Sequence, residues 1–175
     1  MTAELERVEL GPLTERDWEE LAAGEHEPFG PVGSKLTWRP KDRHIGLRAP
    51  DGRLVAVAGA VVADVEVDRA GGFQVVGLGS LIVTRSMRGK GLMTDVVDPL
   101  LRLAEGMGPP RAMIFCRPDL VALYTRIGFI EITDPVWADQ PGGRIEIPLS
   151  AMWRPLRAGV PPWPAGRVDV CGEPF

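Results

Sequence analysis

The sequence predicts an α/β fold built on one central mixed β-sheet. The chain has 175 residues, of which 45% are hydrophobic and 25% charged, and this is typical of a globular chain with one domain and its own core. Strand patterns dominate the first half, and a strand–helix–strand–helix–strand succession follows. Because such helices must bury an apolar face, this order indicates helices packed against a mixed sheet.

The first expected helix begins after Thr14. Thr14 is a typical N-cap residue, and Asp17 stands three positions later, where a carboxylate completes a capping box. This helix is expected to end near Gly24. Residues 25–35 contain two prolines and two glycines, so a loop or a short helix is expected there.

Three strands are expected next, because their residues are β-branched or alternate in polarity. They lie at residues 44–49, 53–67 and 73–84. A Pro-Asp-Gly turn separates the first two strands, and Ala-Gly-Gly separates the second from the third. Gly77 and Gly79 lie inside the third strand, where glycine marks a β-bulge or the close approach of another backbone.

The second half of the chain alternates helices and strands. Apolar residues recur with a helical period over 92–107, and Gly128 is a typical stop for a second helix that begins with Pro118. Short apolar strands are expected at 111–116, 129–132 and 144–149. Prolines concentrate from Pro148 onward, so the C-terminal segment is expected to lie over the domain as an irregular tail.

A basic, glycine-rich loop, Arg85-Ser-Met-Arg-Gly-Lys-Gly, precedes the helix at 92–107. Gly89 and Gly91 lack Cβ atoms, so the backbone can approach a ligand closely. The free N–H groups and the dipole of the following helix favour an anion, above all a phosphate, and Arg88 and Lys90 add positive charge. The loop has neither the Walker A nor the dinucleotide-binding pattern, so a plain glycine turn with surface basic residues is an alternative interpretation.

A second segment, Leu123-Tyr-Thr-Arg-Ile-Gly-Phe, follows after one helix and one strand. Together the two segments resemble the GCN5-related N-acetyltransferase (GNAT) superfamily, over roughly residues 45–132. The Arg/Gln-x-x-Gly-x-Gly/Ala loop of that superfamily is matched by Arg88 and Gly91, with Met93 in place of the small residue. Its Leu-Tyr-x-x-x-Gly-Phe segment is matched by four residues: Leu123, Tyr124, Gly128 and Phe129.

The resemblance implies a twisted mixed sheet whose central parallel strands splay apart around an acyl-CoA. It implies one GNAT domain, residues 1–150, with the tail of residues 151–175 packed on it. Acetyl-CoA would be the co-substrate, with no metal. Its pantetheine arm would bind along the third strand and its pyrophosphate in the loop. The residues implied in CoA binding are Leu81, Ile82, Val83, Arg88, Gly89, Lys90, Gly91, Leu92, Met93, Thr94 and Arg117.

Two residues are candidates for the catalytic step. The resemblance places Tyr124 beside the thioester sulfur, where a phenol can protonate the departing thiolate. Many members carry an acidic residue on the third strand as the base, but Gly79 and Ser80 occupy that neighbourhood here. Ser80 is the second candidate, and removal of the amine proton needs another group or water. Arg117 stands where an Asn is often found, so its contact with CoA is expected to differ.

The function implied is direct transfer of an acetyl group to a primary amine of a small molecule. The chain length, the Thr-Glu-Arg-Asp-Trp start and the Trp-Pro-Ala-Gly tail resemble the aminoglycoside 2′-N-acetyltransferases, and the tail also resembles the nodulation N-acyltransferases. These short matches favour an amino sugar, an aminoglycoside or another natural-product amine, and hence antibiotic modification. Two alternatives stay open: a longer acyl-CoA donor, and a non-catalytic acyl-CoA-binding or sensing module.

Several other side chains have two interpretations. Cys116 is expected to be a small buried hydrophobe, because no His/Asp partner accompanies it as an acyl-accepting nucleophile. His26 and His44 could act as a base, although each is more often an ordinary loop or strand residue. The alternating acidic residues at 64–68 form either a solvated strand face or a wall for a cationic amine. The carboxylate of Phe175 could reach the substrate cleft if the tail folds back.

Charge argues against nucleic acid and against an anionic membrane as partners. The net charge is −4, and such partners need a basic face. Residues 69–94 are the exception, because they include four basic and no acidic residues, which leaves one local anion site. Two cysteines form neither a disulfide framework nor a zinc set. The charged start lacks a signal-peptide core, so a cytoplasmic protein is expected, and a homodimer is compatible with the sequence.

Overall fold

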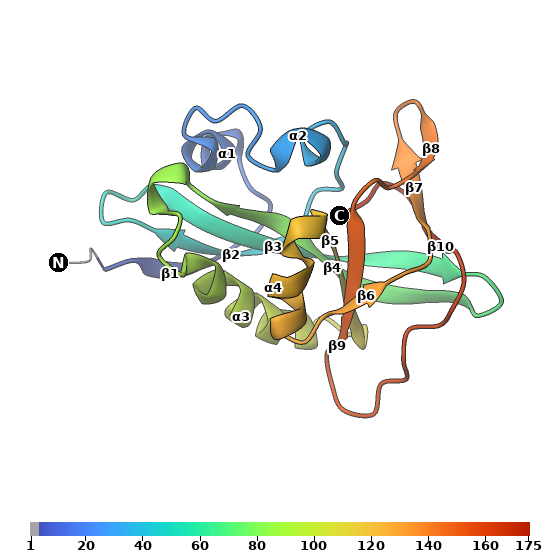
Figure 1. The fold of residues 1–175 in the computed structure, drawn as a ribbon. Coiled ribbons are helices and arrows are strands. Elements are labelled where there is room, and N and C mark those ends of the chain that lie inside the picture. Colours follow the sequence, from blue (N-terminus) through green and yellow to red (C-terminus); the bar gives the residue numbers. More distant parts are fainter. Residues whose placement is uncertain (1–3) are drawn as a thin grey trace.

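The computed structural model describes residues 4–175 as one ten-stranded sheet with helices on both faces (Figure 1). The helices are α1 (Glu15–Ala22), α2 (Gly30–Gly33), α3 (Leu92–Glu105) and α4 (Val121–Arg126). The strands are β1 (Glu6–Leu10), β2 (Arg43–Arg48), β3 (Leu54–Val67), β4 (Gly71–Val83), β5 (Arg111–Cys116), β6 (Ile130–Ile132), β7 (Val136–Gln140), β8 (Gly143–Glu146), β9 (Ser150–Pro155) and β10 (Val168–Val170). The predicted fold class, a mixed sheet flanked by helices, is confirmed.

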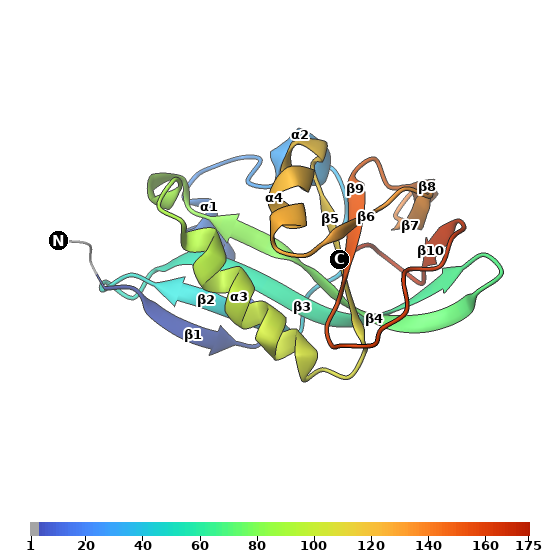
Figure 2. The ribbon, with the colours of Figure 1, turned by 60° about the horizontal axis from the view of Figure 1, so that its bottom comes forward.

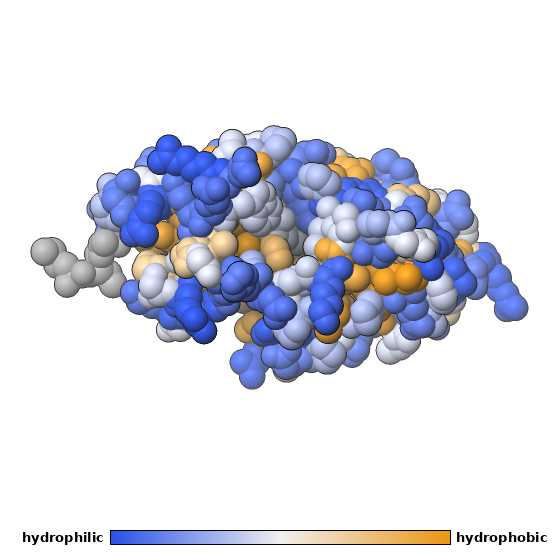
Figure 3. Space-filling view, turned by 90° about the horizontal axis from the view of Figure 1, so that it is seen from above, coloured by the Kyte–Doolittle hydropathy of each residue, from blue (hydrophilic) through white to orange (hydrophobic). Residues whose placement is uncertain are grey.

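The helices divide between the two faces of the sheet. Figures 1 and 2 show α3 and α4 on one face and α1 and α2 on the other. The surface seen from the α1–α2 side is mostly hydrophilic, with smaller hydrophobic patches (Figure 3). The strand order is β6-β9-β5-β4-β3-β10-β7-β8, and β2, with β1 beside it, pairs with the first half of β3. Two pairs, β4 with β5 and β10 with β7, are parallel, and the rest are antiparallel. The sheet is therefore mixed, and its central parallel pair lies between the two helical layers.

The capping box predicted for α1 is present. The backbone N–H of Asp17 donates to the Thr14 hydroxyl at 3.2 Å, and the backbone N–H of Thr14 donates to the Asp17 carboxylate at 2.9 Å. These two bonds satisfy N–H groups that have no partner inside the helix. The following segment contains only the single turn of α2, as expected from its prolines and glycines.

The long β3–β4 hairpin forms the centre of the sheet, and its register shifts at one point. The shift lies between Val57 and Gly59 of β3, so that two residues of β4, Ser80 and Leu81, lie opposite one residue of β3. This is a β-bulge, and Ser80 adopts a left-handed φ of 55° within it. The bulge expected from the glycines of this strand is confirmed.

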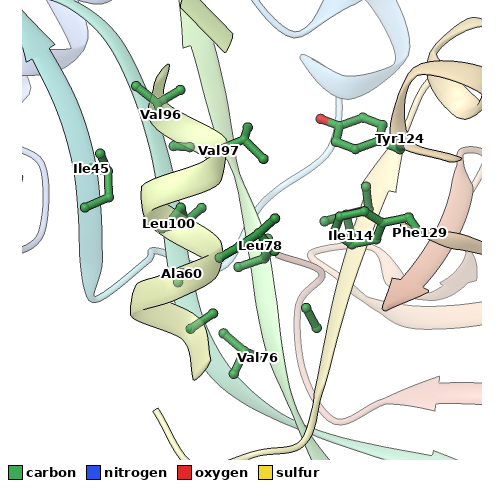
Figure 4. Packing of buried hydrophobic residues seen from close by; sticks show 14 of the residues in the cluster. Ile45, Ala60, Val76, Leu78, Val96, Val97, Leu100, Ile114, Tyr124 and Phe129 are labelled. Atoms are coloured by element: carbon green, nitrogen blue, oxygen red, sulfur yellow. The ribbon is translucent and has the colours of Figure 1, made fainter. Parts of the chain in front are cut away.

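The main core lies between the sheet and the α3–α4 layer. Figure 4 shows Val97 and Leu100 of α3 beside Leu78 of β4, with Tyr124 of α4 across from them. Because successive strand residues point to opposite faces, the neighbours of Leu78 along β4 face away from α3, towards the α1–α2 side. The two faces of β4 therefore meet different surroundings at the same point of the strand.

The C-terminal segment differs from the irregular tail that the sequence predicts. Its first part, β9, pairs with both β5 and β6, and β10 lies between β3 and β7. Neither strand has its partner nearby in the sequence, so no local pattern marks it. The strands β1 and β7 were not predicted either. The division into a domain of residues 1–150 and a tail of residues 151–175 stays a prediction. Residues 1–3 of that domain lie outside the described part of the chain.

Candidate active site

A cleft of about 770 Å³ opens between β4 and β5. The two strands pair only from Val76 to Leu78 on β4 and from Ala112 to Ile114 on β5. Both strands continue further, β4 to Val83, so they diverge beyond Leu78. The splayed parallel strands implied by the family resemblance are confirmed.

One wall of the cleft is the edge of β4 after its bulge. Leu81, Ile82 and Val83 line this wall, and on their other side β4 pairs with β3. Beyond Leu78, β4 has no strand partner towards β5 within residues 4–175. An extended arm that carries amide groups can therefore add to this edge as a further strand. Arg88 already uses one acceptor there, because its Nε donates to the carbonyl of Val83 at 3.0 Å.

The glycine-rich loop after β4 presents free backbone donors. Gly89 and Gly91 both have φ of 77°, a region that glycine reaches without steric cost. Among the described residues, the N–H groups from Gly89 to Met93 have no backbone acceptor, and no side chain caps α3 at Gly91. Five N–H groups and the positive end of a helix dipole at one place are suited to a phosphate or a pyrophosphate.

The segment between α1 and α2 crosses the mouth of the cleft. Glu25 accepts two hydrogen bonds from the guanidinium of Arg88, at 2.6 and 3.1 Å, and these lower the pKa of the Glu25 carboxyl. Further along, Gly30 lies against Arg117, because a Cβ at Gly30 would stand 3.3 Å from Cδ of Arg117. Arg88 and Arg117, the two arginines implied in CoA binding, thus both lie at this mouth.

Tyr124 projects from α4 towards the gap between β4 and β5 (Figure 4). The residue is 8% exposed, and its ring packs edge-on against Phe129 with centroids 5.7 Å apart. Burial, and next the nearby Cys116, raise the pKa of the phenol, so it stays protonated at neutral pH. A protonated phenol at the splay can donate its proton to a leaving group there.

Cys116 also lines the cleft, at the end of β5. Burial, with smaller effects from Glu131 and Asp119, raises the pKa of its thiol to about 11. Since the thiolate is the nucleophile, a thiol with this pKa is almost wholly inert at neutral pH. The structure thus supports the interpretation of Cys116 as a buried hydrophobe.

The reactivity of the two cysteines should differ in the folded protein. At pH 8, iodoacetamide should label the exposed Cys171 and leave Cys116 unmodified. In the Cys171→Ser variant, mass spectrometry should therefore find no label on the folded chain and one label after unfolding in urea. Rapid labelling of folded Cys171→Ser would restore the nucleophile interpretation.

The opposite face of the cleft carries Lys41, which the sequence did not single out, together with two candidates that it did, His44 and Phe175. Lys41 is 4% exposed and lines the cleft beside Gly79. His44 lies next to it, with Nδ1 2.8 Å from the carbonyl of Gly11 and with Nε2 buried and unpartnered. Burial lowers the pKa of His44, so the ring is neutral. In the sequence Lys41 stands in a run of charged loop residues, and nothing there distinguishes it from a surface lysine.

The structure brings most of the predicted site residues together. The residues that line the cleft are Ser80, Leu81, Ile82, Val83, Arg88, Arg117 and Tyr124. The residues in the adjoining loop and first turn of α3, just outside that lining, are Gly89, Lys90, Gly91, Leu92, Met93 and Thr94. Each predicted residue thus belongs either to the cleft or to the loop and helix turn at its mouth.

Other candidates lie elsewhere. His26 is exposed and does not line the cleft. Asp64, Glu66 and Asp68 are exposed along and just after the far half of β3, so they form a solvated face and no acidic wall. Within residues 4–175 there is no group of three or more His, Cys, Asp or Glu side chains placed to hold a metal ion. In the same range no helix has the length and hydropathy required to span a membrane.

Two curated plant proteins resemble half of this chain. Glucosamine 6-phosphate N-acetyltransferase 1 from Oryza sativa subsp. japonica is 37% identical over 91 residues, which is 50% of this chain and 54% of that protein. The probable glucosamine 6-phosphate N-acetyltransferase 2 of the same organism is 32% identical over 83 residues, 47% of this chain and 49% of that protein. The matched region thus spans about half the length of these relatives.

Solved structures share the fold. A GNAT family N-acetyltransferase from Escherichia coli in complex with CoA superposes with a TM-score of 0.61 at 19% identity, over 97% of this chain and 92% of that one. N-acetylglutamate synthase from Neisseria gonorrhoeae, complexed with coenzyme A and N-acetyl-glutamate, superposes with a TM-score of 0.56 at 15% identity, over 87% of this chain and 35% of that one. The model of the Acetyltransferase (GNAT) family matches residues 10–129. The chain therefore belongs to the GNAT family, as its two motifs predict.

Proposed function

We propose that this protein transfers an acetyl group from acetyl-CoA directly to a primary amine of a small molecule. The observation that carries the proposal is the splay of β4 and β5, which opens a free strand edge beside a buried, protonated tyrosine. Membership of the GNAT family and the likeness to the rice acetyltransferases support the same activity.

The cleft suits acetyl-CoA in shape and chemistry. The free edge at Leu81–Val83 offers backbone partners to the two amides of a pantetheine arm, and the N–H groups of the loop offer donors to a diphosphate. Arg88 and Arg117 at the mouth add positive charge for the phosphates. Acetyl-CoA supplies the reactive thioester, and residues of this chain transfer the protons and stabilise the oxyanion.

Direct transfer needs two proton steps. The C–N bond forms as the C–S bond breaks, so the amine loses a proton and the thiolate gains one. Tyr124 donates the proton to sulfur. The amine proton passes to water through the hydroxyl of Ser80, which lies at the bulge in the cleft lining. Backbone N–H groups at the bulge stabilise the negative charge that develops on the carbonyl oxygen.

The acceptor is expected to be a small amine such as an amino sugar. The rice relatives are described as acting on glucosamine 6-phosphate, and this supports an amino sugar ahead of an aminoglycoside or another natural-product amine. Antibiotic modification, a cytoplasmic location and a homodimer stay predictions from the sequence. A longer acyl donor and a non-catalytic sensing role are the alternatives, and turnover of acetyl-CoA against octanoyl-CoA on an amine panel separates them.

Calorimetry with acetyl-CoA tests the proposal. The wild-type protein should bind it saturably, and Gly91→Ala should weaken binding about 10-fold, because an alanine at φ of 77° strains the donor loop. The matched control is Gly52→Ala, which has φ of 85° in a turn away from the cleft and should bind acetyl-CoA like the wild type. The absence of saturable binding in the wild-type protein would exclude the proposed function.

A further inference from the structure

Arg88 spans the mouth of the cleft and already uses three of its hydrogen-bond donors within the chain. Its Nε donates to the carbonyl of Val83 at 3.0 Å, and its two terminal nitrogens donate to the Glu25 carboxylate at 2.6 and 3.1 Å. A guanidinium has five N–H donors, so two remain. Arg88 therefore connects the end of β4 to the segment between α1 and α2.

The carbonyl that Arg88 occupies belongs to the free edge of β4. The backbone N–H of Thr84 donates to the carbonyl of Val55 in β3, so the main-chain groups of Thr84 point towards β3. Because this direction alternates along a strand, the main-chain groups of Val83 point the opposite way, into the cleft. Arg88 thus holds one of the acceptors that an added pantetheine arm would use.

Glu25 competes with a diphosphate for the same guanidinium. Carboxylate and phosphate oxygens both accept paired hydrogen bonds from an arginine, so the two anions need the same donors. The hydrogen bonds from Arg88 lower the pKa of the Glu25 carboxyl, and Arg85 acts in the same direction, so Glu25 is ionised at neutral pH. A diphosphate that approaches Arg88 therefore meets a carboxylate that is already in place.

We propose that Glu25 and Arg88 form an autoinhibitory clasp across the mouth of the cleft. Acetyl-CoA binds by exchange: its diphosphate replaces Glu25 on Arg88, and an amide of its pantetheine arm replaces Arg88 on Val83. This inference rests on the binding of acetyl-CoA proposed above. The exchange frees the segment between α1 and α2 from the end of β4, so donor binding and the position of that segment are coupled.

The clasp is only moderately strong. The side chains of Arg88 and Glu25 are 42% and 20% exposed, so water screens their attraction. The paired geometry of the two hydrogen bonds makes the contact stronger than a single exposed ion pair. We therefore expect the clasp to reduce the affinity for acetyl-CoA about 3- to 10-fold without abolishing binding.

Calorimetry with acetyl-CoA tests the clasp. Glu25→Gln keeps the shape of the side chain and removes its charge, so it should bind acetyl-CoA about 3- to 10-fold more tightly than the wild type at about 0.15 M salt. At about 1 M salt this difference should shrink, because the ion pair is screened. The matched control is Glu19→Gln, which changes the net charge equally at an exposed position of α1 outside the cleft lining and should bind like the wild type.

A double-mutant cycle separates the clasp from simple repulsion between Glu25 and the diphosphate. Arg88→Met should weaken acetyl-CoA binding by itself. In that background Glu25→Gln should improve binding less than about 2-fold, because no pair is left to break. Repulsion alone would give an equal or larger improvement there, since Glu25 is then unpaired. If Arg88→Met binds too weakly to measure, Arg88→Lys, which keeps the charge without the paired geometry, provides the second background.

Three results would overturn the inference. They are unchanged or weaker binding of acetyl-CoA by Glu25→Gln, the same improvement in Glu19→Gln, and an equal or larger improvement when Glu25→Gln is introduced into Arg88→Met. In each case saturable binding by the wild type would leave the proposed function intact. Absence of wild-type binding would instead reject the proposed function and the clasp together.

Discussion

The Tyr124→Phe variant is expected to turn over acetyl-CoA about 100-fold more slowly, while its affinity for acetyl-CoA stays close to that of the wild type. The substitution removes one hydroxyl and leaves the ring, which packs on Phe129 with centroids 5.7 Å apart, so the fold should persist. Burial raises the pKa of this phenol, so the phenol stays protonated and can donate its proton at neutral pH. Steady-state kinetics and calorimetry on the same preparation separate kcat from binding.

Thr125→Ala is the matched control for this prediction. It also removes a hydroxyl from α4, one position further along, but that hydroxyl donates to the carbonyl of Val121 at 2.8 Å and lies outside the cleft lining. Thr125→Ala should leave kcat within a few-fold of the wild type. Equal turnover in Tyr124→Phe would show that water protonates the thiolate and would remove Tyr124 from the mechanism.

Gly77→Ala is expected to lower the free energy of unfolding by about 1–3 kcal/mol, although it adds only one methyl group. A Cβ at this position would lie 2.4 Å from Cγ of Phe175, closer than side chains ever approach. Phe175 is 1% exposed and packs on Phe115, with ring centroids 5.3 Å apart, so it cannot move without opening the core. Urea denaturation followed by circular dichroism measures the change.

Gly72→Ala on the same strand is the control for Gly77→Ala. The nearest atoms to its new Cβ would lie at 3.7 Å, an ordinary contact, so only the general effect of glycine replacement should appear. The double variant Gly77→Ala/Phe175→Leu should lose less stability than the two single variants together, because the collision is shared. If Gly77→Ala matches Gly72→Ala, the close packing of Phe175 on β4 is wrong.

Local signals predicted the elements whose ends are set by nearby residues. The capping box at Thr14, the turn between β2 and β3, the glycine stop at Gly128 and the bulge within β4 all depend on residues a few positions apart. Such signals act through backbone conformation and short-range hydrogen bonds, and the residue types that favour them can be recognised in the sequence. The strand at 111–116 was predicted with its observed bounds for the same reason.

Long-range pairing could not be predicted in this way. The strand β9 lies between β5 and β6, and β10 lies between β3 and β7, so each is stabilised by partners from distant parts of the chain. A three-residue strand such as β10 has no period long enough to recognise. The segments that flank it contain Pro164, Gly166 and Gly172, and these residues favoured an irregular tail. The prediction of an irregular tail was therefore wrong because strand pairing depends on which neighbouring strands the tertiary structure supplies.

By itself, the sequence determined the family and predicted the residues that lie along one wall of the cleft and in the loop at its mouth. The loop of Arg88 and Gly91 and the segment of Tyr124 and Phe129 act through backbone geometry and one phenol, and both lie in short contiguous motifs. Only the tertiary structure decided what forms the opposite face of the cleft. Lys41 is buried there because the loop before β2 lies over Gly79 of β4, and the chemistry of a lysine depends on its burial and its neighbours.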